Sequence, residues 1–394
     1  MPNDTRPDQL NRALAMIERL IAHDTTSHLS NLALIEEVRA YLDGLGIESR
    51  LTRDDTGKKA NLWATIGPAD RGGVVLSGHT DVVPVDGQSW TTDPFTLRRD
   101  GGTLYGRGTC DMKSFVAIAL ALVPDMIAAD LSVPIHLALS YDEEVGCFGV
   151  QKIVADVVEN LPLPRAVIVG EPTSMKLIGG NKGSRIYQTR ITGVPGHTSQ
   201  PTLGANAIYP AARFVSFIEA LNAELEAAAD PESAFVPPHT TITVGVITGG
   251  TAHNVIPEIC EITWGMRLLP TEDGDALETR IHAFCTDVLE PPLKAVADHA
   301  GVVTEKLVDT PGLAPDHGSA AETLVRHLTG LNQSAVVSFG TEAGSFQRAG
   351  MPAVIFGPGS IDQAHKADEF ITLDQVEQCV AFMGDLIAWA KTGE

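Results

Sequence analysis

The hydrophobic residues of the chain recur with two different spacings. Segments 8–22 and 31–45 have apolar residues every three or four positions, which predicts two opening helices. Short apolar runs follow, each ended by turn residues: "NLWATIG", "GVVLSGHTDVVPV", "VPIHLALSYDEE" and "RAVIVGEP". Helical patterns at 112–128 and 149–160 lie between these runs. Strands that alternate with helices predict an α/β domain with a mostly parallel sheet.

The pattern changes after residue 182. A strand ("SRIYQTRITG"), a long helix (204–229), two strands ("TTITVGVITGG", "CEITWGMRLLP"), a helix ("DALETRIHAFCTDVLEP") and a last strand ("GVVTEKLVDT") follow in order. This β-α-β-β-α-β order is that of a ferredoxin-like unit. The α/β pattern then resumes with "SAAETLVRHLTG", "SAVVSFG" and "PAVIFGPG". We therefore expect one domain made of residues 1–182 and 312–394, with a second domain inserted at 183–311.

Composition and charge exclude several classes of protein. The 394 residues are 44% apolar and 20% charged, as in a globular protein of two domains. A net charge of −22 disfavours binding to nucleic acid or to an anionic membrane. The sequence contains no run of about 18 apolar residues, so we expect no membrane span. The five cysteines are scattered without a CxxC pair, so we expect free thiols and a cytoplasmic protein.

Residue types that bind metals recur at the ends of the predicted strands. They are His79, Asp81, Asp111, Glu143, Glu144 and Glu171, with His365 near the C-terminus. Taken singly, each has an ordinary explanation as a solvated residue or, for Asp111, as a helix cap. Ligands collect at the carboxyl ends of parallel strands, however, so these residues are expected to meet at one edge of the sheet. Together they predict a metal centre.

A charge count divides these residues into ligands and others. Asp111, Glu144 and Glu171, with one hydroxide, balance two divalent cations, and His79 and His365 supply nitrogen ligands. Mixed imidazole and carboxylate ligands favour zinc, with cobalt or manganese as substitutes. We expect Asp111 to bridge the two ions.

Two acids near these ligands then have other roles. Glu143 needs no metal and can act as a general base beside a metal-bound water. Asp81, two residues after His79, can accept the other N–H of the imidazole. Asp142 is expected to be solvated.

The motifs that carry these residues resemble those of the dinuclear zinc deacylase and exopeptidase family. They are "SGHTDVVP", "GRGTCDMK", "DEEVGCFG", "GEPT", "GVPGHTSQP", "HNVIP" and "GPGSIDQAHKADEF", in the family's order and over nearly the whole chain. The family includes aminoacylases, succinyl-diaminopimelate desuccinylases and acetylornithine deacetylases. The stretch "FGTEAGSFQRAGMPAVIFGPGSIDQAHKADEFI" is most similar to the acetylornithine deacetylase branch. The resemblance implies the same ligands, Asp81 as orienting residue and Glu143 as base.

The resemblance also implies roles for residues outside this cluster. His197 would stabilise the transition state in the active site of a partner subunit, which implies a homodimer formed by the inserted domain. Asn254 would position the scissile amide, and the guanidinium of Arg267 suits a substrate carboxylate. For a substrate ammonium the candidate is Glu342, whose alternative is an ion pair with a residue such as Arg348.

The expected activity is metal-dependent hydrolysis of a small N-acyl amino acid. The preferred substrate is N2-acetyl-L-ornithine, which gives ornithine and acetate in arginine biosynthesis. A broader N-acyl-amino-acid hydrolase, a desuccinylase-like enzyme or a dipeptidase is the alternative. A non-catalytic scaffold is disfavoured because no ligand of the set is missing and Glu143 is present.

Overall fold

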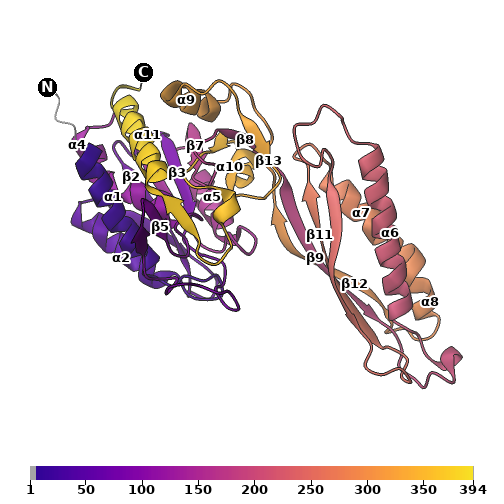
Figure 1. The fold of residues 1–394 in the computed structure, drawn as a ribbon. Helices are drawn as coiled ribbons and strands as arrows, with labels where there is room; N and C mark the ends of the chain where they lie inside the picture. Colours follow the sequence, from indigo (N-terminus) through magenta and orange to yellow (C-terminus); the bar gives the residue numbers. More distant parts are fainter. Residues whose placement is uncertain (1–5, 394) are drawn as a thin grey trace. The chain divides into compact units, whose positions relative to one another are not determined.

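The computed structural model describes residues 6–393, which form two compact units (Figure 1). The first unit contains Met1–Gly180, Leu313–Val336 and Thr341–Glu394, and the second contains Asn181–Gly312 and Val337–Gly340. The expected insertion at 183–311 differs from the long segment of the second unit by two residues at its start and one at its end. The short segment Val337–Gly340 was not expected to join it.

The first unit is built on an eight-stranded sheet. In sheet order, the strands are β1 (Ser49–Arg53), β2 (Ala60–Ile66), β6 (Ile135–Ser140), β3 (Val74–His79), β7 (Ala166–Val169), β14 (Ala353–Ile355), β8 (Ile178–Asn181) and β13 (Ala335–Val337). The four central strands β6, β3, β7 and β14 are parallel, whereas β1, β2 and β8 pair antiparallel. The α/β prediction is confirmed, and the parallel part of the sheet is its centre.

Helices of the first unit surround this sheet. They are α1 (Arg6–Ile21), α2 (Leu32–Gly44), α3 (Lys113–Ala121), α4 (Val123–Ala128), α5 (Phe148–Asn160), α9 (Ala320–Thr329), α10 (Ala343–Arg348) and α11 (Leu373–Thr392). Every residue of β3 and β6 is buried, which explains their continuous apolar runs. The single helix predicted over 112–128 is divided into α3 and α4, because Pro124 begins a new first turn where its missing N–H is tolerated.

Smaller elements complete the first unit. A three-stranded sheet has the order β15 (Phe370–Thr372), β5 (Thr103–Tyr105) and β4 (Arg98–Asp100), and a 3-10 turn covers Ile361–Gln363. The apolar sides of α1, α3 and α11 share one buried core with β2, β3 and β6. No described helix is long and apolar enough to cross a membrane. All five cysteines are buried and free, as expected.

The second unit is an antiparallel sheet covered by helices. The strand order is β10 (Thr241–Gly249), β11 (Ile259–Leu268), β9 (Gly183–Thr192) and β12 (Gly301–Thr310). The helices are α6 (Ile208–Ala227), α7 (Gly274–Phe284), a π-helical turn at Cys285–Leu289 and α8 (Glu290–Lys294), with a 3-10 turn at Pro201–Leu203. Figure 1 shows α6, α7 and α8 beside this sheet. The order along the chain is β-α-β-β-α-β, as predicted.

A candidate metal centre at the carboxyl ends of three strands

The predicted metal ligands of the first unit lie at one edge of its large sheet. His79 is the last residue of β3, Glu143 and Glu144 lie in the turn after β6, and Glu171 follows β7. The sheet order β6-β3-β7 makes these three strands direct neighbours, so their carboxyl ends are adjacent. Asp111 lies just before α3, and His365 comes after the Ile361–Gln363 turn.

Asp111 lies between the two histidines and faces each with a different oxygen. Its Oδ1 is 2.9 Å from Nε2 of His79, and its Oδ2 is 3.3 Å from Nε2 of His365. His79 is also 4.0 Å from Oε1 of Glu171, and His365 is 2.9 Å from Oε2 of Glu144. The carboxylate of Asp111 therefore has the geometry of a group shared by two neighbouring sites, one with Glu171 and one with Glu144.

The two adjacent glutamates face different members of the cluster. Ligand atoms of His79, Asp111 and Glu144 lie within 4.8 Å of one another, and so do those of His79, Glu143 and Glu171. Both glutamates are thus close enough to hold an ion. The expectation that Glu144 is the ligand and Glu143 the base stays a prediction.

Burial and mutual repulsion shift the pKa of nearly every group in the cluster. Burial raises the pKa of Glu171 well above its usual value, and the charges of Asp111 and Glu143 raise it further. Burial, with Asp111 as the next cause, raises the pKa of Glu144 to about 7. Burial alone lowers the pKa of His79, but the hydrogen bond to Asp111 and the charge of Glu171 raise it well above its usual value. The cluster is short of positive charge.

The donor set fits a pair of divalent cations. Glu144 Oε1 and Glu171 Oε1 are buried and have no hydrogen-bond partner among the described residues. Buried carboxylate oxygens without a partner are costly unless a cation neutralises them. His79, Asp111 and Glu171 could hold one ion, and Asp111, Glu144 and His365 the other, with the mixed nitrogen and oxygen ligands that zinc accepts.

Asp81 differs from its expected role. The Nδ1 atom of His79 lies 3.0 Å from the backbone carbonyl oxygen of Asp81 and 3.7 Å from its carboxylate, so the carbonyl accepts the ring N–H. The carboxylate instead accepts the backbone N–H groups of Glu143 (3.1 Å) and Glu144 (3.3 Å) and the hydroxyl of Ser27 (2.7 Å). Asp81 therefore fixes the tautomer of His79 through its backbone and holds the two glutamates through its side chain.

The expectation for Asp142 is wrong. This residue is half-buried and forms an ion pair with Lys59, whose ammonium also donates to the carbonyl of Ser27. Asp142 has a positive φ of 56°, which helps the chain turn sharply after β6. Its carboxylate thus anchors the turn that presents Glu143 and Glu144.

Glu369 is a part of the site that the sequence did not indicate. Its Oε1 accepts the backbone N–H groups of Gly108 (3.1 Å), Cys110 (2.8 Å) and Asp111 (3.0 Å). Its Oε2 accepts from the guanidinium of Arg107 at 2.6 Å, and both side chains are 1% exposed. The loop that carries Asp111 is therefore held by one buried carboxylate. In the sequence, the one feature that could have indicated this role is an acid four residues after His365, in "HKADEF".

Glu342 is fully buried close to the metal-ligand cluster. The residue is 0% exposed, and its Oε2 accepts from Ser77 at 3.3 Å. Burial raises its pKa to about 7, with a counteracting hydrogen bond from Ser140. Its Oε1 is buried without a hydrogen-bond partner among the described residues, and the charges of His79 and Asp81 act on its carboxylate. The expectation that Glu342 contacts a substrate ammonium stays a prediction. The alternative partner Arg348 forms no ion pair with it in the described part of the chain.

The remaining predicted residues lie in the second unit. His197 and Asn254 are exposed on two loops that pair, with the amide of Thr198 donating to the carbonyl of Asn254 at 3.2 Å. Nδ1 of His197 accepts the backbone N–H of Ser199 at 3.1 Å, so the neutral ring carries its proton on Nε2. Arg267 is exposed on β11 and forms no ion pair with any described carboxylate.

The sequence matches known proteins over almost its full length. The model of peptidase family M20/M25/M40 matches residues 75–389. An acetylornithine deacetylase of Myxococcus xanthus is 35% identical over 388 residues, which cover 97% of this chain and 98% of that protein.

Solved structures with low sequence identity share the fold. An M20 family metallo-carboxypeptidase of Sulfolobus solfataricus superposes with a TM-score of 0.74 at 16% identity, covering 96% of this chain and 99% of that one. A dinuclear metal-binding peptidase of the M20 family from Bacillus subtilis gives a TM-score of 0.64 at 17% identity, covering 97% and 98%.

The role of Glu369 leads to a first prediction. Glu369→Gln leaves the buried Arg107 without its counter-charge, so the free energy of unfolding should fall by about 3–5 kcal/mol. The loop that presents Asp111 should loosen as well, with metal affinity lower by about 10–100-fold. Chemical denaturation and competition with a metal chelator measure the two effects.

An exposed acid of α11 provides the matched control. Glu377→Gln should change the free energy of unfolding by less than about 0.5 kcal/mol and leave metal affinity unchanged. Metal affinity equal to wild type in Glu369→Gln would show that the Asp111 loop does not need this carboxylate.

The charge of His365 leads to a second prediction. Hydrogen bonds to Asp111 and Glu144 raise the pKa of His365 to about 10 in the metal-free protein. Because this pKa is above the usual 6.5, the interaction stabilises the metal-free fold fully below pH 6.5 and is lost as pH rises through about 10. A metal bound through Nε2 must displace the proton.

Calorimetric zinc titrations at pH 8, in buffers of different ionisation enthalpy, should therefore show proton release. The His365→Ala variant should release about one proton fewer than the wild-type protein. Equal proton release from both proteins would mean that His365 is already neutral or does not bind the metal.

Proposed function

The chain belongs to peptidase family M20/M25/M40 and is a metal-dependent hydrolase, and from this we propose that it removes the acetyl group of N2-acetyl-L-ornithine. The main support for metal-dependent hydrolysis is the position of the Asp111 carboxylate, which faces His79 with one oxygen and His365 with the other. The choice of substrate is supported by similarity to acetylornithine deacetylases along almost the whole chain.

In the proposed hydrolysis, the residues of the first unit have two roles, metal binding and proton transfer. His79, Asp111, Glu144, Glu171 and His365 would hold two ions, for which zinc suits the mixed ligands. When bound, such ions supply an acidified water and polarise the acyl carbonyl. Glu143 takes a proton from the attacking water and gives it to the departing amine.

The surroundings of Glu143 suit this proton transfer. Burial, together with the charge of Glu144, raises its pKa well above the usual value, so the carboxylate accepts a proton more readily. The thiol of Cys147 is 3.4 Å from its Oε1, and the carboxylate of Asp81 holds its backbone N–H. Both contacts limit the orientations of the base.

Two residues of the second unit are proposed to recognise the substrate. Arg267 would bind the α-carboxylate, since a guanidinium pairs with a carboxylate through two parallel hydrogen bonds. Its exposure and lack of a carboxylate partner in the described part of the chain support this role. Asn254 would position the amide that is cleaved.

His197 is proposed to stabilise the oxyanion across a homodimer. Its Nε2–H is free to donate, because Nδ1 is already occupied by the amide of Ser199. The edge strands of the second unit support dimerisation: Val246 and Ile247 on β10 and Val303 on β12 are 50–68% exposed. Exposed apolar edge strands are ready to pair with another chain.

The structure favours a second candidate through Glu342. This acid was the expected contact for the ammonium of ornithine, and it is enclosed between Ser77 and Ser140. Without that contact, the residues named above recognise any N-acyl amino acid. A broader N-acyl-amino-acid hydrolase or a dipeptidase is therefore the alternative.

A substrate panel decides between the two candidates. If Glu342 contacts the ammonium of ornithine, the zinc-loaded enzyme should hydrolyse acetylornithine with a kcat/KM at least about tenfold above that for acetylmethionine, because one charged contact contributes about 1.5–3 kcal/mol. Arg267→Gln should lower kcat/KM for both substrates equally, since both have the carboxylate. Similar values for the two substrates, or higher values for dipeptides, would favour the broader enzyme.

The roles of the adjacent glutamates lead to a further prediction. Glu143→Gln should abolish turnover while two metal ions stay bound, because the base is not a ligand. Glu144→Gln should instead lose one of the two ions. Metal content measured by mass spectrometry after dialysis checks this, and the reverse result would exchange the two roles.

A mixing experiment tests the dimer. His197→Ala should lower kcat by about 10²–10³, the effect of removing one oxyanion donor. If the histidine acts across the interface, then mixed His197→Ala and Glu143→Ala subunits should regain activity in hybrid dimers. Verified subunit exchange without recovered activity would place His197 in its own subunit's site.

A further inference from the structure

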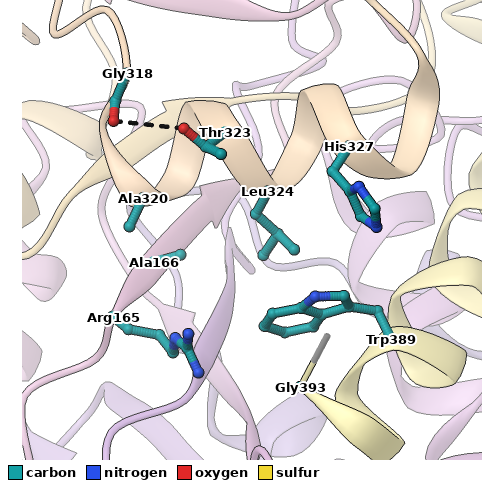
Figure 2. A pocket seen from close by; sticks show the side chains of 9 residues that line it. All are labelled: Arg165, Ala166, Gly318, Ala320, Thr323, Leu324, His327, Trp389 and Gly393. Atoms are coloured by element: carbon teal, nitrogen blue, oxygen red, sulfur yellow. Dashed lines mark hydrogen bonds between the residues drawn. The ribbon is translucent and has the colours of Figure 1, made fainter.

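The first unit has a second cavity that its metal centre does not use. Figure 2 shows it between α9, the C-terminal helix α11 and the start of β7. Its volume is about 550 Å³. Pockets for small molecules usually measure about 300–1,000 Å³, so the cavity is large enough for one. Leu324 and His327 on α9 point toward the ring of Trp389 on α11 (Figure 2).

The cavity lies at the opposite edge of the sheet from the metal centre. Arg165 and Ala166 line it at the amino end of β7, whereas Glu171 follows the carboxyl end of that strand. The five residue-to-residue steps from Ala166 to Glu171 span about 17 Å of extended chain. A ligand of this cavity therefore does not touch the groups that hold the metal ions.

The charge of the cavity is unusual for this chain. Acids outnumber lysine and arginine by 50 to 28, yet none of the described residues that line the cavity is acidic. Arg165 and His327 are exposed there and make no ion pair or side-chain hydrogen bond with a described residue. Most other arginines of the described chain have a carboxylate partner, for example Arg12, Arg50 and Arg326. The open guanidinium is available to an anion.

An aromatic ring lies beside this guanidinium. The Cζ atom of Arg165 is 5.4 Å from the centre of the Trp389 ring, a cation–π distance that holds the charged group against the indole. Ala166, Ala320 and Leu324 add apolar surface to the wall, and the hydroxyl of Thr323 donates to the carbonyl of Gly318 at 3.4 Å. A ligand that satisfies both features has a carboxylate for Arg165 and a flat apolar body for the indole and Leu324.

We propose that this cavity is a second binding site, separate from the metal centre, for a small carboxylate with a flat apolar body. Arg165 pairs with the carboxylate, and Trp389 stacks on the body of the ligand, while His327 lines the same cavity. Binding at this site does not depend on which substrate the enzyme hydrolyses. A failure of the proposed deacetylation would therefore not affect this proposal.

Fluorine NMR can observe this site alone. The protein contains four tryptophans, so labelling with 5-fluorotryptophan gives four signals. The signal that is missing in the Trp389→Phe variant belongs to Trp389. Benzoate titrated into the metal-loaded enzyme should shift the Trp389 signal saturably. Benzamide has the same shape without the charge, and should bind at least about tenfold more weakly, which is the lower end of the effect of a charged hydrogen bond.

Two arginine variants complete the test. Arg165→Gln should lower the affinity for benzoate by about tenfold or more, as read from the shift of the Trp389 signal. The control is Arg213, an exposed arginine of α6 that also has no ion pair with a described residue. Arg213→Gln should bind benzoate like the wild-type protein. Hydrolytic activity should stay unchanged in both variants, which shows that the fold is intact. No saturable shift of the Trp389 signal, equal binding of benzamide, or unchanged binding in Arg165→Gln would each overturn the proposal.

Discussion

The concentration of buried carboxylates at one edge of the sheet is the constraint on which the first unit depends. Asp111, Glu144 and Glu171 are all nearly enclosed, and among the described residues only His79 and His365 form ion pairs with them. Isolated buried charges cost several kcal/mol each, so a fold gathers them only where cations repay the cost. The parallel centre of the sheet makes this possible, because three adjacent strands end at the same edge.

A frame of further carboxylates holds these ligands in place through backbone amides. Asp81 binds the amides of Glu143 and Glu144, and Glu369 binds the amide of Asp111 and two amides before it. Each acid joins segments that are far apart in the sequence, and a charged acceptor makes a stronger hydrogen bond than a neutral one. These hydrogen bonds do not involve the metal ligands' own side chains, so they support the ligands from behind, as outer carboxylates do in metal sites.

The sequence predicted the elements, and that His79, Asp111, Glu144 and Glu171 come together, because both follow local patterns. Continuous apolar runs mark β3 and β6, and an acid or histidine after each run marks the site. What it did not predict depends on tertiary contacts. The distance from His79 to the carbonyl of Asp81, the pairing of Asp142 with Lys59 and the enclosure of Glu342 are set by how strands and turns approach in space. No pattern of residue types along the chain contains that information.

In a chain with so many acids, an arginine without a carboxylate partner is uncommon. With 50 acids against 28 lysines and arginines, a guanidinium meets a carboxylate easily, and buried or half-buried arginines such as Arg107 and Arg185 have theirs. Arg165 and Arg267 have none among the described residues, and each lies beside a hollow of its own unit. Because the surrounding negative charge repels free anions, only a site with a directed cation can bind one. Arg213 is unpaired as well, so the lack of a partner alone does not indicate a site. For Arg165 and Arg267 the neighbouring hollow is a second observation, and it supports the two proposals: a substrate carboxylate at Arg267 and a carboxylate ligand away from the metal centre at Arg165.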